Sequence, residues 1–367
     1  MRLALYLPSL RGGGAERVMV TLANGFAERG HAVDLVLAKA EGPYLPEVAR
    51  KVRIVDLGAR RVVSSLPGLV RYLRRERPRA MLSALNHANV IALLARRLAD
   101  VPTRLVVSEH SHLSSSLNGA PNRRGRLMPG FMRRTYPWAD GVVAVSAGVA
   151  DDLAQAISLP RQRIAVVYNP VATDELLARA EAPLDHPWFA PGEPPVVLSV
   201  GRLTVQKDFG VLLSAFAKLR ARRPARLMIL GEGELRPELE SLAQQLGIDA
   251  DVALPGFRDN PYAYMRRAAV FVLSSRFEGL PNALIQAMAC GTPVVSTDCP
   301  SGPAEILQDG QWGRLVPVGD VELMAMAISV TLDNKVHPDV SSRANHFNEK
   351  RSIEKYLTVM FPCRERK

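Results

Sequence analysis

Cysteine is scarce in this chain: three residues, Cys290, Cys299 and Cys363, stand among 367. Three cysteines are too few and too oddly numbered for a disulfide framework, so we expect a reducing compartment, the cytoplasm. The sequence also lacks a charge-free apolar run of about 18 residues, which excludes a membrane-spanning helix. Its first residues, MRLALYLPSLRGGG, are broken too early by glycine for a signal peptide. We therefore expect a protein that is soluble or rests on a membrane surface.

Charge is unevenly distributed along the chain, whose formal net charge is +11. Residues 1–180 contain 26 basic and 14 acidic side chains, whereas residues 181–367 contain 21 and 22. The first half is therefore basic and the second nearly neutral, which predicts different partners for the two halves. A basic half favours nucleic acid, anionic lipid headgroups or a phosphorylated substrate.

Short apolar runs alternate with helical stretches in both halves, the pattern of parallel sheets covered by helices on both faces. The expected strands of the first half are Leu3–Pro8, Val33–Leu37, Arg53–Leu57, Ala80–Ala84, Leu105–Ser108, Gly141–Ser146 and Ile164–Tyr168. Those of the second half are Val196–Val200, Arg226–Leu230, Val252–Leu254, Val270–Leu273, Val294–Ser296 and Arg314–Val316.

The length exceeds what one hydrophobic core usually spans, so we expect two domains. Six prolines between Asn169 and Pro195 indicate a linker, which we place at 173–195. The expected N-terminal domain is 1–172, with the segment 345–367 packing back on it, and the C-terminal domain is 196–344. The predicted fold class is α/β, with two doubly wound, Rossmann-like domains facing each other across a cleft and ligands bound at the carboxyl ends of the strands.

Glycines Gly12 to Gly14 lie between the first expected strand and a helix. There they let the backbone approach a phosphate beside the N–H groups of the helix start. A dinucleotide fingerprint is disfavoured, because Arg17 occupies the place of its third glycine and strand Val33–Leu37 lacks a following acidic residue for ribose. A phosphate contact and a merely flexible turn are the two interpretations that this loop leaves open.

Two loops of the second half carry charged residues after expected strands. SVGRLTVQKDFG, at 199–210, contains Arg202 and Lys207, a pair of cations that suits a diphosphate, although this spacing also occurs on ordinary surfaces. SRFEGLPNALIQAMACGTPVV, at 275–295, places Glu278 just before a helix opened by Pro281 and Asn282. A carboxylate there can hold a sugar hydroxyl while the N–H groups of the helix start bind phosphate.

Together these segments resemble the family 4 glycosyltransferases, retaining enzymes of the two-domain GT-B architecture. The matching segments are GGGAERV at 12–18, SEHS at 108–111, GRLTVQKD at 201–208, LGEGELRPELE at 230–240, LPGF at 254–257, residues 275–295, and NHFNEKRSIEKYL at 345–357, which is similar to the closing helix of the family. SEHS and EGLPNALI are most similar to bacterial transferases that add N-acetylhexosamines, notably GalNAc, to undecaprenyl-linked glycans.

The resemblance implies roles for particular residues. Arg202 and Lys207 would neutralise the donor diphosphate, His110 would reach the transferred sugar near its 6-hydroxyl, and Glu278 would hold the 3- or 4-hydroxyl. Further donor contacts are implied for Gly13, Gly14, Phe257, Arg258, Gly279, Leu280 and Asn282. Gln286 stands where the family usually has a second Glu that binds ribose, and its amide oxygen accepts hydrogen bonds without the strength of a charge.

The resemblance also implies a mechanism without a metal, a cofactor or a side-chain nucleophile. The leaving phosphate would take the proton of the acceptor in a front-face attack, and fixed cations and N–H groups would stabilise its growing charge. Asp249-Ala-Asp251 spells a metal-binding DxD motif, but it precedes a strand, which favours a surface turn. His110 and His112 share a face, yet no third ligand is evident, so sugar contact at His110 is favoured. For His87, a helix start and a ligand contact stay equally open.

Two arginine-rich stretches are candidates for contact with the acceptor or a membrane. Arg71, Arg74, Arg75 and Arg79 close an expected helix, where cations also favour the helix dipole. The second stretch mixes cations with apolar side chains, a composition typical of a segment on anionic lipid, although a helix packed on its own core stays open. Its residues are Arg123, Arg124, Phe131, Arg133, Arg134 and Trp138.

The sequence therefore predicts a cytoplasmic enzyme, peripheral on the inner face of the plasma membrane. It would move a sugar, an N-acetylhexosamine, from a UDP-sugar bound by the C-terminal domain to a lipid-linked or surface-polysaccharide acceptor. The alternatives are a sugar-nucleotide epimerase or phosphorylase of the same architecture, and a non-catalytic nucleic-acid-binding protein. No nucleic-acid partner is expected, because the arginine clusters lack regular aromatic interleaving and no nucleic-acid motif is present.

Overall fold

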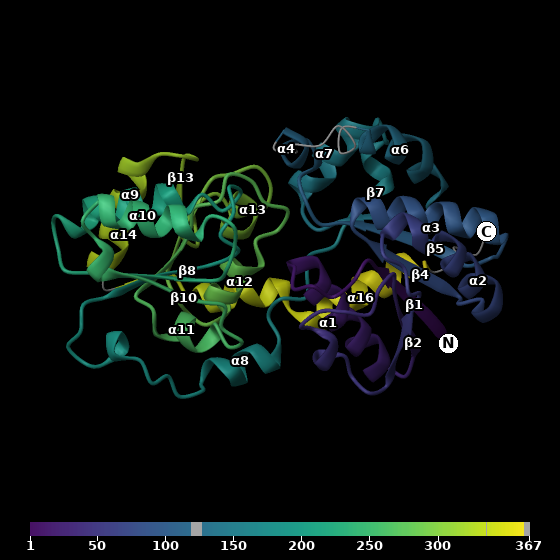
Figure 1. Cartoon of the computed structure of the whole chain (residues 1–367), viewed down its shortest axis with the longest axis horizontal. Helices are drawn as coiled ribbons and strands as arrows, with labels where there is room; N and C mark the ends of the chain where they lie inside the picture. Colours follow the sequence, from purple (N-terminus) through teal and green to yellow (C-terminus); the bar gives the residue numbers. More distant parts are fainter. Residues whose placement is uncertain (119–126, 335, 363–367) are drawn as a thin grey trace. The chain divides into compact units, whose positions relative to one another are not determined.

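The computed structural model describes residues 1–118, 127–334 and 336–362. The chain divides into two compact units (Figure 1). The first unit is Met1–Pro170 with Glu349–Lys367, and the second is Val171–Asn348. Each unit is built on one parallel sheet, so the predicted fold class of two doubly wound α/β domains is confirmed.

The first unit contains a seven-stranded parallel sheet in the order β3-β2-β1-β4-β5-β6-β7. Buried apolar runs of the sequence form the inner strands, as expected for a sheet covered on both faces, whereas the edge strand β3 is largely exposed. The strand order reverses between β1 and β4, so the loops after these strands border the crevice where ligands bind in such folds. The strands are β1 Arg2–Leu7, β2 Ala32–Leu37, β3 Val52–Asp56, β4 Ala80–Ala84, β5 Arg104–Glu109, β6 Gly141–Ala144 and β7 Ile164–Val166.

Helices flank this sheet, and the last helix of the chain, α16 (Glu349–Met360), packs in the first unit against α1, β4 and β5. In Figure 1 the yellow α16 runs beside the purple α1. Gly25 of α1 makes this approach close, because a Cβ there would lie 2.1 Å from Ile353 Cδ1. The other helices described are α1 Gly14–Glu28, α2 Leu66–Glu76, α3 Asn86–Ala99, α4 Leu113–Asn118, α6 Met128–Thr135 and α7 Ala147–Ile157.

The second unit contains a six-stranded parallel sheet in the order β10-β9-β8-β11-β12-β13, which reverses between β8 and β11. Its strands are β8 Val196–Val200, β9 Arg226–Leu230, β10 Val252–Gly256, β11 Val270–Leu273, β12 Val294–Thr297 and β13 Arg314–Val316. Its longer helices are α9 Phe209–Arg220, α10 Arg236–Gln245, α12 Asn282–Ala289 and α14 Val321–Asp333. The shorter ones are α11 Tyr262–Arg267, α13 Pro303–Leu307 and α15 Val340–Ala344.

The segment predicted as a linker, 173–195, includes a helix, α8 (Asp174–Ala180). The Thr173 hydroxyl caps this helix by accepting from the Leu176 N–H at 3.0 Å, and acidic residues occupy the first turn. The prolines lie outside α8, so they do not interrupt it. Asn260 Nδ2 donates to the Arg179 carbonyl at 2.8 Å, and α8 packs on α11, so this part belongs to the second unit. Within the described residues, no helix is both long enough and apolar enough to span a bilayer.

Candidate functional site

Two charged side chains of the second unit meet where its strand order reverses. Lys207 follows β8 and Glu278 follows β11, the strand paired with β8. Lys207 Nζ lies 2.6 Å from Glu278 Oε1, and the Ser275 hydroxyl donates to the same oxygen at 2.6 Å. Glu278 is 7% exposed. Both donors bind Oε1, and no residue in the described part of the chain donates to Oε2, so Oε2 can accept a hydrogen bond from a ligand.

The loops that carry these two residues are joined by several hydrogen bonds. The Ser274 hydroxyl donates to the Lys207 carbonyl at 2.7 Å, and Gln206 Nε2 donates to the Phe277 carbonyl at 2.9 Å. Arg276 Nε donates to Asp208 Oδ2 at 2.7 Å, which raises the pKa of Arg276. These contacts fix the backbone on both sides of Lys207, so its ammonium group is held by the loops as well as by Glu278.

A third loop supports the loop of Lys207 from the side of β9. Leu203 N–H donates to the Glu232 carbonyl at 2.9 Å, and Leu235 N–H donates back to the Leu203 carbonyl at 3.0 Å. Gly231 is required here, because its φ is 143° and a Cβ would lie 1.9 Å from the Gly201 carbonyl oxygen. Close backbone packing is therefore the physical reason for Gly231 in the motif at 230–240.

The structure places the other expected donor contacts around the same sheet edge. Arg202 is exposed and has no acidic partner among the residues described. Phe257, which is 57% exposed, and Arg258 follow β10. Gly279 and Leu280 are buried just before α12, whose first residue is Asn282, and Gln286 lies partly exposed in its second turn. All of these lie on loops or a helix at the carboxyl ends of the strands, the edge that binds ligands in doubly wound sheets.

In the first unit, Gly13 and Gly14 form the start of α1 after β1, as the sequence predicts. Gly12 has a φ of 101°, and Gly13 is the N-cap residue without a side-chain capping bond. Their N–H groups therefore stand at the start of a 15-residue helix, a position that favours anions.

His110 follows β5, at the same edge of the first sheet. Its Nε2 lies 3.1 Å from Ser108 Oγ, and its Nδ1 is buried without a hydrogen-bond partner among the described residues. Burial lowers the pKa of His110 to about 4, so the ring is uncharged at neutral pH. An uncharged imidazole can exchange hydrogen bonds with a sugar but cannot pair with a phosphate as a cation.

Glu109 is a buried acid beside His110 that the sequence alone did not single out. It is 2% exposed, and its Oε1 accepts from Asn89 Nδ2 at 2.9 Å and from the Tyr136 hydroxyl. Burial raises the pKa of Glu109 to about 7, although both hydrogen bonds oppose the shift. The only sequence signal was its place in SEHS, because its partners stand 20 and 27 residues away.

The described residues contain no group of three or more His, Cys, Asp or Glu placed to hold an ion. Asp251 of the DxD sequence ends a one-turn 3-10 helix just before β10 and pairs with Arg220 and Arg226. His112 lies 3.5 Å from Asp152 and 3.0 Å from the Ser115 hydroxyl. His87 is exposed in the first turn of α3. It therefore stands at a helix start, one of the two interpretations that the sequence left open, and a ligand contact stays a prediction.

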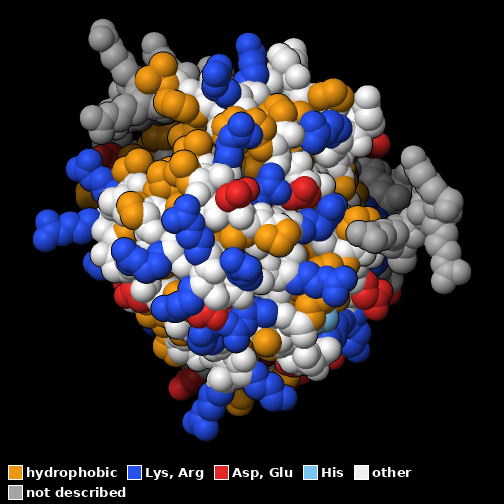
Figure 2. All heavy atoms as spheres, turned by 90° about the vertical axis from the view of Figure 1, so that its right-hand side faces the viewer, with side chains coloured by type: hydrophobic (Ala, Val, Ile, Leu, Met, Phe, Trp, Pro, Cys, Tyr) orange, Lys and Arg blue, Asp and Glu red, His pale blue; other side chains and the backbone are white. Residues whose placement is uncertain are grey.

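The basic residues predicted to face an acceptor or a membrane lie in the first unit. Arg71, Arg74, Arg75 and Arg79 are all exposed. Figure 2, which faces the side of α2, shows Lys and Arg side chains spread over this surface with fewer acidic ones between them.

The second basic stretch is only partly described. Phe131 is 55% exposed on α6, and Arg133 and Arg134 are also exposed, whereas Trp138 is half-buried under the Arg97 guanidinium. Arg123 and Arg124 lie outside the described residues. The helix α6 also buries Met132, so it both packs on its own core and presents apolar and basic side chains outward.

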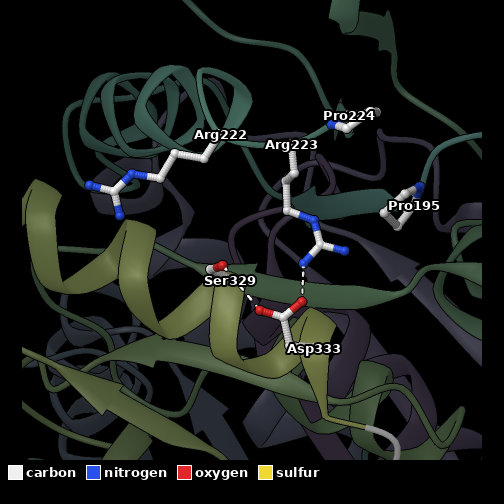
Figure 3. A pocket seen from close by; sticks show the side chains of 6 residues that line it. All are labelled: Pro195, Arg222, Arg223, Pro224, Ser329 and Asp333. Carbon is white, nitrogen blue, oxygen red and sulfur yellow. Dashed lines mark hydrogen bonds and ion pairs between the residues drawn. The ribbon is translucent and has the colours of Figure 1, made fainter.

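A separate pocket of about 480 Å³ lies at the opposite edge of the second sheet. Pro195 and Pro224, which line it, stand at the amino ends of β8 and β9, and Arg223 is paired with Asp333 (Figure 3). Figure 3 shows Arg222 directed away from that pair. Because ligands of doubly wound sheets bind at the carboxyl ends of the strands, this pocket is not part of the site around Lys207.

Both halves of the chain match models of known families. Residues 12–175 match "Glycosyltransferase Family 4", and residues 194–334 match "Glycosyl transferases group 1". A Campylobacter jejuni relative is N-acetylgalactosamine-N,N'-diacetylbacillosaminyl-diphospho-undecaprenol 4-alpha-N-acetylgalactosaminyltransferase. It is 31% identical over 94% of this chain and 93% of its own length. The lipopolysaccharide core biosynthesis glycosyltransferase LpsE of Rhizobium meliloti is 30% identical over 95% and 96%.

Solved structures show the same fold. HepE of Anabaena, in complex with UDP-glucose, superposes with a TM-score of 0.80 at 18% identity, covering 98% of this chain and 99% of that one. Sucrose-phosphate synthase of Thermosynechococcus elongatus gives 0.82 at 20% identity, covering 98% of both. These structures and the paired Rossmann-like units show the GT-B fold, and the two family matches with the full-length relatives at 30% identity or more show that the chain belongs to glycosyltransferase family 4.

Proposed function

We propose that this glycosyltransferase moves an N-acetylhexosamine from a UDP-sugar to a lipid-linked glycan, with retention of configuration and without a metal ion. The observation that carries the proposal is the Lys207–Glu278 pair, which lies where the strand order of the second sheet reverses. Lys207 Nζ lies 2.6 Å from Glu278 Oε1, and hydrogen bonds join the two loops that carry these residues. The choice of sugar and acceptor draws support from the Campylobacter relative, whose name describes transfer of N-acetylgalactosamine to an undecaprenyl-linked glycan.

The donor diphosphate would bind in the second unit, between fixed positive groups. Lys207 and the exposed Arg202 supply cations, and the start of α12 supplies N–H groups. Such groups stabilise the charge that grows on the leaving phosphate more than the charge already present in the bound donor. Two cations can replace a divalent metal in this task, which is why we propose metal independence.

Glu278 would hold the transferred sugar. Its Oε1 is occupied by Lys207 and Ser275, and its Oε2 accepts no hydrogen bond from the described residues. A sugar hydroxyl can therefore bind Oε2 while Lys207 stays in place. Cys299, which lies nearby, does not act as a nucleophile at neutral pH, because burial raises its pKa to about 12.

The acceptor would approach from the first unit, at a membrane surface. Exposed arginines of α2 and the exposed Phe131, Arg133 and Arg134 of α6 combine positive charge with an apolar side chain, which suits anionic lipid. We therefore propose a cytoplasmic protein bound peripherally to the inner face of the plasma membrane.

The experiment is a transfer assay with UDP-sugars and an undecaprenyl-diphosphate-linked oligosaccharide, with the product identified by mass spectrometry. We expect addition of one or more N-acetylhexosamines in α linkage when an α-linked donor is used. A parallel incubation of donor alone tests the epimerase alternative, which predicts a changed sugar without an acceptor. Failure of every UDP-sugar to extend the acceptor, with conversion of donor alone, would overturn the proposal.

A further inference from the structure

Three polar side chains form a line that ends at His110. Ser108 and His110 stand two residues apart at the end of β5, on the same face, and Tyr356 belongs to α16, the last helix of the chain. The Tyr356 hydroxyl lies 3.2 Å from Ser108 Oγ, which lies 3.1 Å from His110 Nε2. Ser108 and Tyr356 are 0% exposed, so water does not replace these contacts.

The direction of these hydrogen bonds follows from counting donors and acceptors. If Tyr356 donates to Ser108, then Ser108 donates to His110 Nε2, and only the Nδ1–H of His110 lacks a partner among the described residues. In the reverse direction, Nε2–H donates to Ser108 and Ser108 donates to Tyr356. That arrangement leaves both the buried Tyr356 O–H and the Nδ1 lone pair without partners. If Ser108 instead accepts from both Nε2–H and Tyr356, its own O–H and the Nδ1 lone pair lack partners. Buried polar groups without partners are costly, so the first direction is favoured.

We infer that Tyr356 and Ser108 are positioning residues that set the tautomer of His110, holding the proton on Nδ1 and the ring in one orientation. His110 then presents an uncharged N–H donor, suited to an acceptor oxygen such as a sugar hydroxyl or an N-acetyl carbonyl. Tyr356 of the closing helix would thus act on His110 through Ser108, which stands 248 residues before Tyr356 in the sequence. The effect on turnover rests on the proposed function, whereas the tautomer does not.

The tautomer can be measured directly by nitrogen NMR of the full-length protein labelled at histidine, with His110→Gln used to assign the His110 signals. The shifts of protonated and unprotonated ring nitrogens are well separated. We expect His110 to be neutral at pH 7.5 and protonated at Nδ1. Protonation at Nε2, or a doubly protonated ring at that pH, would overturn the inference.

Two variants test the line itself. In Tyr356→Phe and Ser108→Ala, we expect the His110 signals to move toward a mixture of tautomers, because Nε2 loses its fixed donor. Tyr6→Phe is the matched control, since Tyr6 also forms a buried hydroxyl pair with a serine, Ser65, at 2.6 Å in the same unit. This variant should leave the His110 signals unchanged. Unchanged His110 signals in both test variants would overturn the inference.

Turnover gives the second readout. We expect Tyr356→Phe and Ser108→Ala each to lower kcat about tenfold, the effect of one lost hydrogen bond, with little change in KM for the donor. The double variant should be no worse than either single one, because both interrupt the same line. Tyr6→Phe should keep wild-type kcat. If Tyr6→Phe and Tyr356→Phe lose kcat equally, the Tyr356 hydroxyl contributes only to packing, and a positioning role is contradicted. If the wild-type protein transfers no sugar, the proposed function fails, and the NMR result still decides the tautomer.

Discussion

The buried carboxyl group of Glu109 predicts an unusual dependence of stability on pH. Its pKa is raised from 4.5 to about 7 in the folded protein, so the folded state binds this proton more tightly than the unfolded state does. The stabilising effect of the proton is fully present below pH 4.5 and is lost as the pH rises to about 7. A shift of this size corresponds to about 3 kcal/mol of unfolding free energy.

Glu109→Gln removes this titration while keeping an oxygen that can accept from Asn89 and Tyr136. Relative to the wild-type protein, the variant should gain about 2 to 3 kcal/mol of unfolding free energy between pH 5 and pH 8. Urea unfolding followed by Trp138 fluorescence, with Trp188 and Trp312 replaced by Phe in both proteins, reports on the first unit alone.

The matched control is Glu354→Gln, because Glu354 lies exposed on α16 of the same unit. The difference in unfolding free energy between Glu354→Gln and the wild-type protein should be the same at pH 5 and pH 8. If the Glu109→Gln difference is also constant, the Glu109 carboxyl group does not titrate near neutrality in the folded protein, and the reasoning from its burial is refuted.

Three further predictions concern the donor site. Protein passed through a chelating resin and assayed in excess EDTA should keep its transfer rate. A loss of transfer rate that Mg²⁺ or Mn²⁺ restores would contradict metal independence. Arg202→Ala should raise KM for the UDP-sugar about tenfold and change the unfolding free energy by no more than about 0.5 kcal/mol, because this side chain is exposed. Gln286→Glu should lower KM for the donor severalfold, since a carboxylate accepts hydrogen bonds from ribose hydroxyls more strongly than an amide does; an unchanged or higher KM would remove Gln286 from the ribose contacts.

Most strands could be predicted from the sequence because they are short apolar runs that the fold buries; the edge strand β3, with Arg53 and Asp56 exposed, is an exception. Every expected strand boundary agrees with the structure within two residues. Strand β10 extends to Gly256, beyond the expected Leu254, and includes Pro255. Because β10 is the edge strand of its sheet, the missing N–H of this proline is tolerated there.

The structure has a short helix, α8, within the predicted linker; the sequence analysis missed this helix because the nearby prolines indicate a linker more strongly than the short helix start indicates a helix. Thr173 followed by Asp174 and Glu175 is a helix N-terminal pattern, and the structure uses it. The position of Lys207 beside Glu278 could be expected, since both follow strands, but that β8 and β11 are neighbours depends on the strand order of the folded sheet.

The partners of Glu109 and Ser108 could not be predicted from the sequence. Asn89, Tyr136 and Tyr356 come from three different elements, and nothing in the local pattern indicates their convergence on β5. A buried hydrogen-bond network is defined by tertiary packing, whereas motif spacing describes single loops. The sequence therefore predicts candidate residues on the loops, and it does not reveal the buried partners beneath them.

The central claim is that Lys207 and Glu278 form the donor site of a sugar transferase. The most direct measurement is the turnover number of Lys207→Ala and Glu278→Gln, compared with Lys218→Ala and Glu322→Gln, which interrupt an exposed Lys–Glu pair in the same unit. We predict that each site variant loses at least about 100-fold in kcat while remaining folded, and that the two controls keep wild-type turnover. Near-normal turnover in both site variants would contradict the account.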